Sequence, residues 1–392
     1  MKVARAAAGL AALALVGGAL TACGSNSSNS AGGGDGTITL GAWFPLTGAQ
    51  ASSGIPISKG IEAYFDQLNA SGGINGHKVN FIAEDDAFDP QQTLQVARQL
   101  VSQKHVLAIV NPDGTATTAA TFPFVLQQSK IPIFGTYGGD ATWYTPPQDG
   151  LFGTQALYED QAEVATDWAI ESGAKHLTIV RDDPAAFANV ASAAIKHAQA
   201  KGITADEVVT KIGTTDYGPV VSQVKAKGSD AVLMILPPQE AAVYLKEAQL
   251  QGVKAQPYAY APAASGAVIT LAGSAANGLR GVSLTVLPDG TSDALTQYRD
   301  AMAKYAKADP EPYSLSSYAN AAAFTQILKS ITGPITSDSI AKAIQSATNI
   351  DTGLLPTLSY SADSHLGTHA VMRVEVVNGK LVSRGDFVTA QN

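Results

Sequence analysis

Short apolar runs alternate with amphipathic stretches along the chain from Thr37 onward. Continuous apolar runs are typical of strands that helices bury on both faces, and they predict strands at 38–43, 79–83, 106–110, 131–134, 177–180, 203–209, 231–236 and 279–286. Apolar residues recur at helical spacing within 57–68, 94–101 and 241–248, and helices are expected again at 293–305, 315–328 and 339–346. The order strand, helix, strand predicts an α/β fold with mostly parallel sheets.

Turn and cap signals bound these elements. Asp89-Pro90 has the composition of a helix start, and Gly72-Gly73, Gly202 and Gly252 each stand where a helix should end. Asn378-Gly379 lies between two alternating segments, 369–377 and 380–388, which predicts a closing β-hairpin. The periodicity breaks near 150–157 and again near 277–282, so we expect two domains.

Composition limits the partners. Without Lys2 and Arg5, 23 basic side chains stand against 33 acidic ones, and this acidic balance argues against nucleic acid or anionic lipid surfaces as partners. The single cysteine, Cys23, leaves the folded part without disulfides. No second apolar run of membrane length follows the N-terminal one.

The N-terminus predicts export and membrane attachment. Lys2 and Arg5 precede a short apolar run that ends in Leu-Thr-Ala-Cys, and this resembles a bacterial lipoprotein signal. We expect residues 1–22 to be the signal peptide, Cys23 the lipid-modified N-terminus, and 23–36, rich in Gly, Ser and Asn, a flexible linker. The alternative is an ordinary secretory signal with a cysteine at its cleavage site. On the first interpretation the protein is lipid-anchored on the extracytoplasmic face of the cell membrane.

Several motifs at the right mutual spacing carry a family resemblance. They are the segment 40–48 (LGAWFPLTG), Gly60, the segment 69–76 (NASGGING), the acids 84–86 and Asp89-Pro90. Together they resemble the periplasmic leucine-binding proteins. The resemblance implies a two-lobed type I periplasmic binding protein, with each lobe a doubly wound sheet flanked by helices and joined to the other by hinge strands. Lobe 1 would combine 37–154 with 282–356, and lobe 2 would combine 155–281 with 357–392.

Ligand-binding residues are expected where strands end. The segment 111–118 follows one strand and opens a helix, so its free amides and hydroxyls suit a carboxylate or carbonyl oxygen. The resemblance implies ligand contacts in lobe 1 from Ser53, Thr115, Ala116, Thr117, Thr136, Tyr137 and Gly138. For Thr115 and Thr117 the alternative is helix capping without a ligand. In lobe 2 the matching loops place Phe187, Pro237 and Ala261 at the ligand.

The second lobe departs from the family. Leucine-binding proteins hold the ligand ammonium group with two tyrosines and a glutamate. The corresponding stretches here, 184–187, 237–238 and 260–262, contain no carboxylate, and the first two contain no phenol. A buried ammonium group without an acidic partner is costly, so we expect a ligand without positive charge. Trp43, Trp143 and the prolines could then line an apolar pocket, unless Glu240, Tyr258 or Tyr260 supplies what is missing.

Signals for catalysis and for a metal are absent from the sequence. It contains no nucleophile elbow, zinc-protease helix or phosphate-binding loop. The acids 84–89 do not have the spacing of a calcium loop, and His365 and His369 are expected to be ordinary surface histidines.

These observations favour a monomeric solute receptor of an ABC importer. It would bind a branched-chain or other apolar amino acid, or an aromatic or branched acid or amide, by hinge closure and deliver it to a permease and ATPase complex. It would be neither an enzyme nor a cofactor-dependent protein. The alternatives are a ligand sensor for a membrane signalling partner and, less favoured, a tethered hydrolase.

Overall fold

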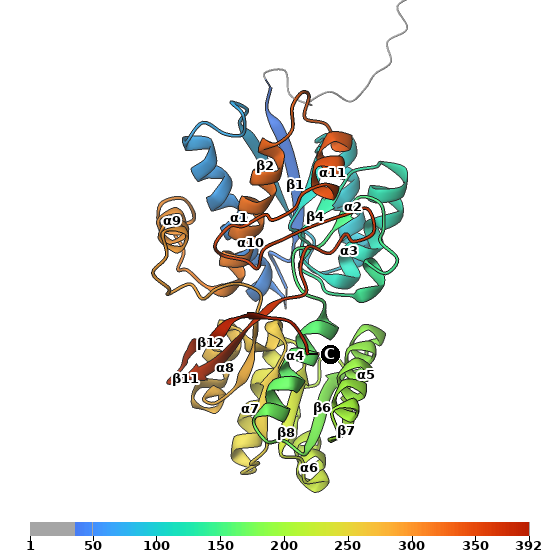
Figure 1. Ribbon diagram of the computed structural model, residues 1–392, viewed down its shortest axis with the longest axis vertical. Coiled ribbons are helices and arrows are strands. Elements are labelled where there is room, and N and C mark those ends of the chain that lie inside the picture. The colour runs from blue at the N-terminus through green and yellow to red at the C-terminus, as the bar shows by residue number, and fades with distance from the viewer. Residues whose placement is uncertain (1–35, 49, 392) are drawn as a thin grey trace, which may run out of the picture.

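The computed structural model describes residues 36–48 and 50–391. The expected signal peptide, the lipid attachment at Cys23 and all of the linker but Gly36 lie outside these ranges. Figure 1 shows two lobes, one above the other, each built on its own sheet. No helix in the described ranges combines the length and apolar character needed to cross a membrane.

The first lobe is built on a five-stranded parallel sheet with the order β2-β1-β3-β4-β5. Its strands are β1 (Ile38–Phe44), β2 (Val79–Asp85), β3 (Ala108–Val110), β4 (Ile133–Phe134) and β5 (Leu151–Phe152). All seven residues of β1 are buried, as expected for a strand between two helical layers. Ile38, Leu40, Ala42 and Phe44 belong to one core, and Trp43 belongs to the core on the opposite face.

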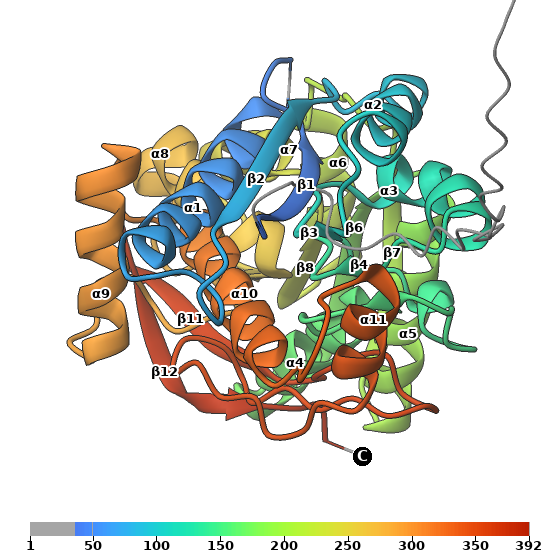
Figure 2. The same cartoon turned by 90° about the horizontal axis from the view of Figure 1, so that it is seen from above.

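Helices cover both faces of this sheet. The lobe contains α1 (Ala51–Ala70), α2 (Pro90–Ser102), α3 (Thr115–Phe122), α9 (Asp293–Ala301), α10 (Pro312–Lys329) and α11 (Ser337–Gln345). From above, α1 and α10 lie side by side on one face (Figure 2). They approach closely at Gly60, where a Cβ atom would lie 2.1 Å from the Ser314 carbonyl oxygen.

The second lobe is built on a seven-stranded mixed sheet with the order β12-β11-β10-β9-β8-β6-β7. Its strands are β6 (His176–Asp182), β7 (Thr204–Thr210), β8 (Ala231–Ile235), β9 (Gln256–Ala259), β10 (Arg280–Ser283), β11 (Val371–Val377) and β12 (Lys380–Val388). Strands β6 to β10 pair in parallel, whereas β11 and β12 join in antiparallel register. Its helices are α4 (Tyr158–Glu171), α5 (Ala185–Ala200), α6 (Gly218–Lys227), α7 (Pro238–Leu250) and α8 (Gly266–Ala272).

Local signals are confirmed where they depend on a few neighbouring residues. Asp89 caps α2, because its side chain accepts hydrogen bonds from the amides of Gln91 and Gln92. The hairpin turns at Asn378 and Gly379 with φ of 51° and 75°, which matches a type I′ turn. The α/β fold and the two parallel-dominated sheets are also confirmed.

Two strands were missed, and three were predicted longer than they are, at 106–110, 131–134 and 279–286. β5 has only two residues and lies in the stretch interpreted as a break, and β9 begins at Gln256-Pro257, which is typical of a turn. The run 279–286 forms a strand only over Arg280–Ser283, after which the chain returns to the first lobe, where the Val286 amide donates to the Leu354 carbonyl. The domain boundaries themselves stay a prediction.

Candidate functional site

A cavity of about 320 Å³ lies between the two lobes, at the carboxyl ends of the strands. This is the edge of an open α/β sheet where ligands bind, and the volume is at the lower end of small-molecule sites. The lobe 1 lining is Gln50, Ser53, Phe88, Asp113, Gly114, Thr115, Ala116, Ala119, Tyr137, Asp140, Trp143 and Tyr313. The remaining lining, from lobe 2 and the segments that lead into it, is Tyr158, Pro184, Ala186, Phe187, Ile212, Pro237, Pro238, Tyr260 and Pro262.

The loop between β3 and α3 lines the cavity on the side of the first lobe. Gly114 adopts φ 109°, which favours glycine, and this turn brings Thr115 and Ala116 to the cavity at the start of α3. The Thr115 hydroxyl lies 3.3 Å from the Tyr158 hydroxyl. The structure therefore places Thr115 and Ala116 at the cavity, with the threonine hydroxyl already hydrogen-bonded.

Some of the other expected contacts lie outside the cavity. Thr117 is buried and its hydroxyl donates to the Asp113 carbonyl oxygen at 3.1 Å, four residues earlier in the chain, so its side chain neither lines the cavity nor caps α3. Thr136 is buried, and Gly138 packs beneath the Trp143 ring. Trp43 is also buried in the core, where its Nε1 donates to Thr118 Oγ1 at 3.2 Å, so the expectation that it lines the pocket is wrong.

Asp113 brings a carboxyl group to the cavity that sequence reasoning did not single out. It is 6% exposed, and the Ser53 hydroxyl lies 3.1 Å from its Oδ2. Burial raises the pKa of Asp113 to about 7, although the Ser53 hydrogen bond opposes the shift.

Asp140, the second acid at the cavity, caps a short helical turn, because its side chain accepts a hydrogen bond from the Thr142 amide at 2.9 Å. Both acids that line the cavity come from the first lobe, and the lobe 2 residues that line it include no carboxylate.

Aromatic rings from both lobes surround the cavity. The rings of Tyr137 and Tyr313 have centroids 5.4 Å apart, as do those of Tyr158 and Tyr260, and Phe187 lies 6.4 Å from Tyr260. Burial raises the pKa of Tyr158 to about 12, so this phenol is neutral at physiological pH. Of the expected residues, Ser53, Tyr137, Phe187 and Pro237 also line the cavity.

Phe88 stands at the mouth of the cavity in an unusual backbone conformation. Its φ is 60°, rare for a bulky residue, and its side chain is 37% exposed. The ring lies over Gly114, where a Cβ atom would come within 2.8 Å of it. Ile212 of lobe 2 also lines the cavity and is 56% exposed. Strained and exposed apolar residues of this kind cluster at ligand sites.

A pair of buried acids lies behind the lobe 2 wall. Glu240 accepts hydrogen bonds from the Tyr217 hydroxyl at 2.6 Å and the Gly213 amide at 2.9 Å. Asp182, at the end of β6, is fully buried, and neither of its oxygens accepts a hydrogen bond from a described group. Burial and then the neighbouring Glu240 raise the pKa of Asp182.

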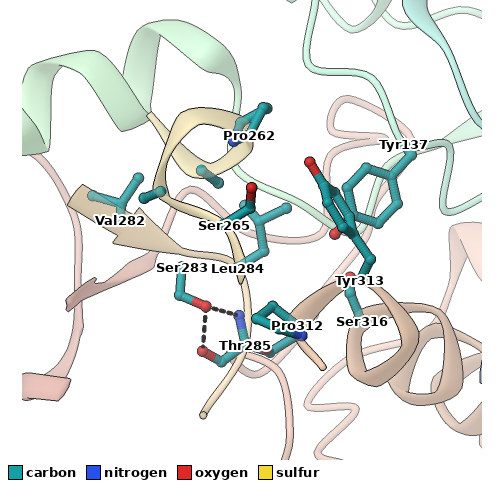
Figure 3. A pocket seen from close by; sticks show the side chains of 12 residues that line it. Tyr137, Pro262, Ser265, Val282, Ser283, Leu284, Thr285, Pro312, Tyr313 and Ser316 are labelled. Carbon is teal, nitrogen blue, oxygen red and sulfur yellow. Dashed lines mark hydrogen bonds between the residues drawn. The ribbon is translucent and has the colours of Figure 1, made fainter. Parts of the chain in front are cut away.

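A smaller cavity of about 20 Å³, room for one water molecule, adjoins the first one at the hinge. Tyr137, Pro262 and Tyr313 line both cavities, and Ala261 lines only the smaller one. Figure 3 shows the two tyrosine rings side by side opposite Pro262 and Ser265. The expected ligand contact from Ala261 is therefore placed behind the main cavity.

The histidines and acids considered for a metal do not gather. His365 is buried, its Nδ1 2.8 Å from the Gln148 carbonyl oxygen, so the expectation of a surface histidine is wrong there. His369 lies 2.8 Å from an Asp160 oxygen. In the ranges 36–48 and 50–391, no three His, Cys, Asp or Glu side chains are grouped to hold a metal ion.

A sequence profile of the periplasmic binding protein family matches residues 37–380. The chain belongs to this family of solute-binding proteins. The Leu/Ile/Val-binding protein homolog 8 of Brucella abortus is 28% identical over 314 residues, which cover 74% of this chain and 76% of that one. The resemblance to leucine-binding members is thereby confirmed.

Solved structures share the two-lobed fold. A possible leucine/isoleucine/valine-binding protein from Rhodopirellula baltica superposes with a TM-score of 0.82 at 22% identity, covering 90% of this chain and 97% of that one. The branched-chain amino acid transporter substrate-binding protein LivJ from Streptococcus pneumoniae, in complex with isoleucine, has a TM-score of 0.76 at 22% identity, with 90% and 99% covered. The expected type I periplasmic binding protein fold is confirmed.

The residues that sequence reasoning missed differ in how far they could have been found. Tyr158 directly follows the predicted break between the domains. An aromatic residue where the chain passes from one lobe to the other could have been predicted to lie at the cleft. Phe88 stands next to the recognised acidic turn. Tyr313 opens α10, far along the chain from its partner Tyr137, and no local pattern marks it as a cleft residue.

Proposed function

We propose that this protein is the extracytoplasmic solute-binding lipoprotein of an ABC importer. It captures one small organic solute between its lobes and presents the closed form to a permease and ATPase complex. The observation that supports this most is the cavity between the lobes, lined from both sides by aromatic rings and prolines. A solute in that position contacts both lobes at once, so it favours the closed state through contacts that the open state lacks.

The proposal assigns ligand contact to Ser53, Thr115, Ala116, Tyr137, Phe187 and Pro237. Lobe 1 supplies the amides at the start of α3 and lobe 2 supplies Phe187 and the proline wall. The solute has a mainly apolar body, because aromatic and proline side chains make up much of the lining. Branched-chain and other apolar amino acids, aromatic or branched acids, and amides are the classes to compare.

Attachment to the membrane rests on the Leu-Thr-Ala-Cys motif and Cys23. Acylation there would keep the protein beside the importer, and the stretch of small polar residues that follows would serve as a leash. Radiolabelled palmitate incorporated into the parent protein, and lost in Cys23→Ser, is the expected result. An unacylated parent protein released into the medium would refute the anchor without touching the fold.

Two measurements test the transport role. The mature chain from residue 23 onward, carrying Cys23→Ser, is screened by thermal unfolding against the solute classes above. A ligand at 100 times its dissociation constant should stabilise the protein by about 2.7 kcal/mol. Deletion of the gene should then abolish uptake of that same solute. A protein stabilised by a solute whose uptake is unaffected by deletion would contradict the transport role.

A further inference from the structure

The charges around the main cavity are all of one sign. Asp113 and Asp140 line it, and among the described residues no lysine, arginine or histidine does. The charged neighbours that influence the cleft tyrosines are acids as well: Asp113, Asp140, Asp182, Glu240 and Glu311. Both lobes therefore place acidic groups near the bound solute, and the two acids that line the cavity itself come from lobe 1.

The groups that would bind a ligand carboxylate are engaged within the protein. The Thr115 hydroxyl pairs with Tyr158, and the Thr117 hydroxyl donates to a backbone carbonyl oxygen. The free amides at the start of α3 do attract negative charge, but Asp113 stands directly before the Gly114 N-cap, whose own amide donates to the Tyr137 carbonyl oxygen at 3.0 Å. A ligand carboxylate placed here would lie beside the Asp113 carboxyl group with no basic side chain to balance it.

The rest of the lining suits a positive charge on an apolar body. A cation is attracted to an aromatic ring within about 6 Å of its centre, and more strongly where water is excluded. Tyr137, Tyr158, Tyr260, Tyr313 and Trp143 all line one cavity of about 320 Å³ and are half-buried or buried. Phe187 and the prolines add apolar surface for the remainder of the solute.

We infer that the solute is an organic cation, an alkylammonium group on an apolar body, held by Asp113 and the surrounding aromatic rings. This inference rests on the proposed function and narrows it. It replaces the uncharged or carboxylate ligand that the lobe 2 sequence suggested, because the acidic partner comes from lobe 1. Asp113 acts as the counter-ion, and its own position is maintained by Ser53.

The test compares solutes that differ only in charge. 2-Phenylethylamine is the cation, 2-phenylethanol the neutral analogue and phenylacetate the anion, and phenethyltrimethylammonium separates a hydrogen-bonding ammonium group from a quaternary one. Leucine and phenylalanine represent the zwitterions. Dissociation constants are measured by titration calorimetry on the mature chain carrying Cys23→Ser. We expect the cations to bind at least about tenfold more tightly than the alcohol, and phenylacetate to bind more weakly than either.

Asp113→Asn should weaken binding of the amine about tenfold and leave binding of the alcohol unchanged. Asp66→Asn, which removes an exposed acid of α1, should change neither. Unchanged thermal unfolding of Asp113→Asn shows that it is folded, and retained alcohol binding shows that its cavity is intact.

Three results would overturn the inference. In the first, phenylacetate or an amino acid binds more tightly than the amines, and the proposed function then stands with a different solute. In the second, Asp113→Asn binds the amine as tightly as the parent protein does. In the third, none of these solutes binds, and only this result also counts against the proposed function.

Discussion

Asp113 and Asp182 are carboxyl groups in surroundings that disfavour their charged forms. Asp113 is buried at the cavity, and Asp182 is buried behind it beside Glu240. Burial raises the pKa of both, so the folded protein holds these protons more tightly than the unfolded chain does. The stability that this contributes is present at low pH and is lost as the pH rises.

The raised pKa values of these two acids determine how the stability of the folded protein depends on pH. The free energy of unfolding of the ligand-free protein should fall as the pH rises from about 4, the ordinary aspartate range, to above 7. Asp182→Asn, which resembles the protonated acid, should flatten this decline and raise the melting temperature at pH 8. Thermal unfolding between pH 5 and 9 measures both, and Asp66→Asn, at an exposed site on α1 of the first lobe, serves as the control. A variant with the parent slope would show that Asp182 is not the group responsible.

Phe187 is the residue at which the lobe 2 contact is most directly tested. It lines the cavity from α5 and packs near Tyr260. Phe187→Ala removes apolar protein surface that would contact the solute. The affinity for the solute should therefore fall about tenfold or more, while the fold is retained. Calorimetric titration with the solute found in the screen measures this. Leu250→Ala, at an 80% exposed site of the same lobe, should bind as the parent does. Full affinity in Phe187→Ala would remove this residue from the site.

Among the elements, the packing of α1 on α10 depends on one small residue. At Gly60 a side chain would meet the Ser314 carbonyl oxygen at 2.1 Å and the Ser317 hydroxyl oxygen at 2.2 Å. The two helices approach this closely because Gly60 has no Cβ. The same glycine was part of the family motif in the sequence, where its structural reason was not visible.

Gly60→Ala should force α1 and α10 apart and lower the free energy of unfolding by about 1–3 kcal/mol, the usual cost of overpacking. Denaturant unfolding of the ligand-free protein measures the change. Gly266→Ala, in α8 with nothing within 4 Å of the added methyl group, should be neutral or slightly stabilising. Equal stability of the two variants would contradict the tight approach of the helices.

On the scale of the whole molecule, the solute site is shared by two lobes that have separate cores. One core surrounds the second sheet and two others cover the faces of the first. Phe88 on one lobe and Ile212 on the other are exposed at the cavity mouth. Movement of the lobes toward each other would remove both side chains from water, which adds to the contacts that the solute makes.

Closure should therefore be visible in solution. Small-angle scattering of the mature chain should give a smaller radius of gyration when its solute is added, and no change with a solute that does not stabilise the protein. Ile212→Ser should bind more weakly, because the mouth buries less apolar surface on closure. Identical scattering curves with and without a stabilising solute would show that binding does not depend on hinge closure.

The sequence by itself determined the features that depend on neighbouring residues. Asp89 caps a helix, Asn378-Gly379 turns a hairpin, and a continuous apolar run forms β1, because each depends on backbone preferences or burial within a few positions. The family motifs added the fold and the cleft between lobes. The resemblance also predicted Tyr137 and Phe187 as ligand contacts, because both follow strand ends, and the structure places both at the cavity.

Only the tertiary structure decided which side chains meet in that cleft. In the sequence Asp113 is part of a polar loop, and the structure shows that it lines one cavity together with Tyr137, Tyr158, Tyr260 and Tyr313. Those tyrosines come from four separate segments, and their meeting depends on strand order and on how the lobes face each other. Charge complementarity in a binding site is a property of the assembled surface, so the sign of the solute charge could not be deduced from any one loop.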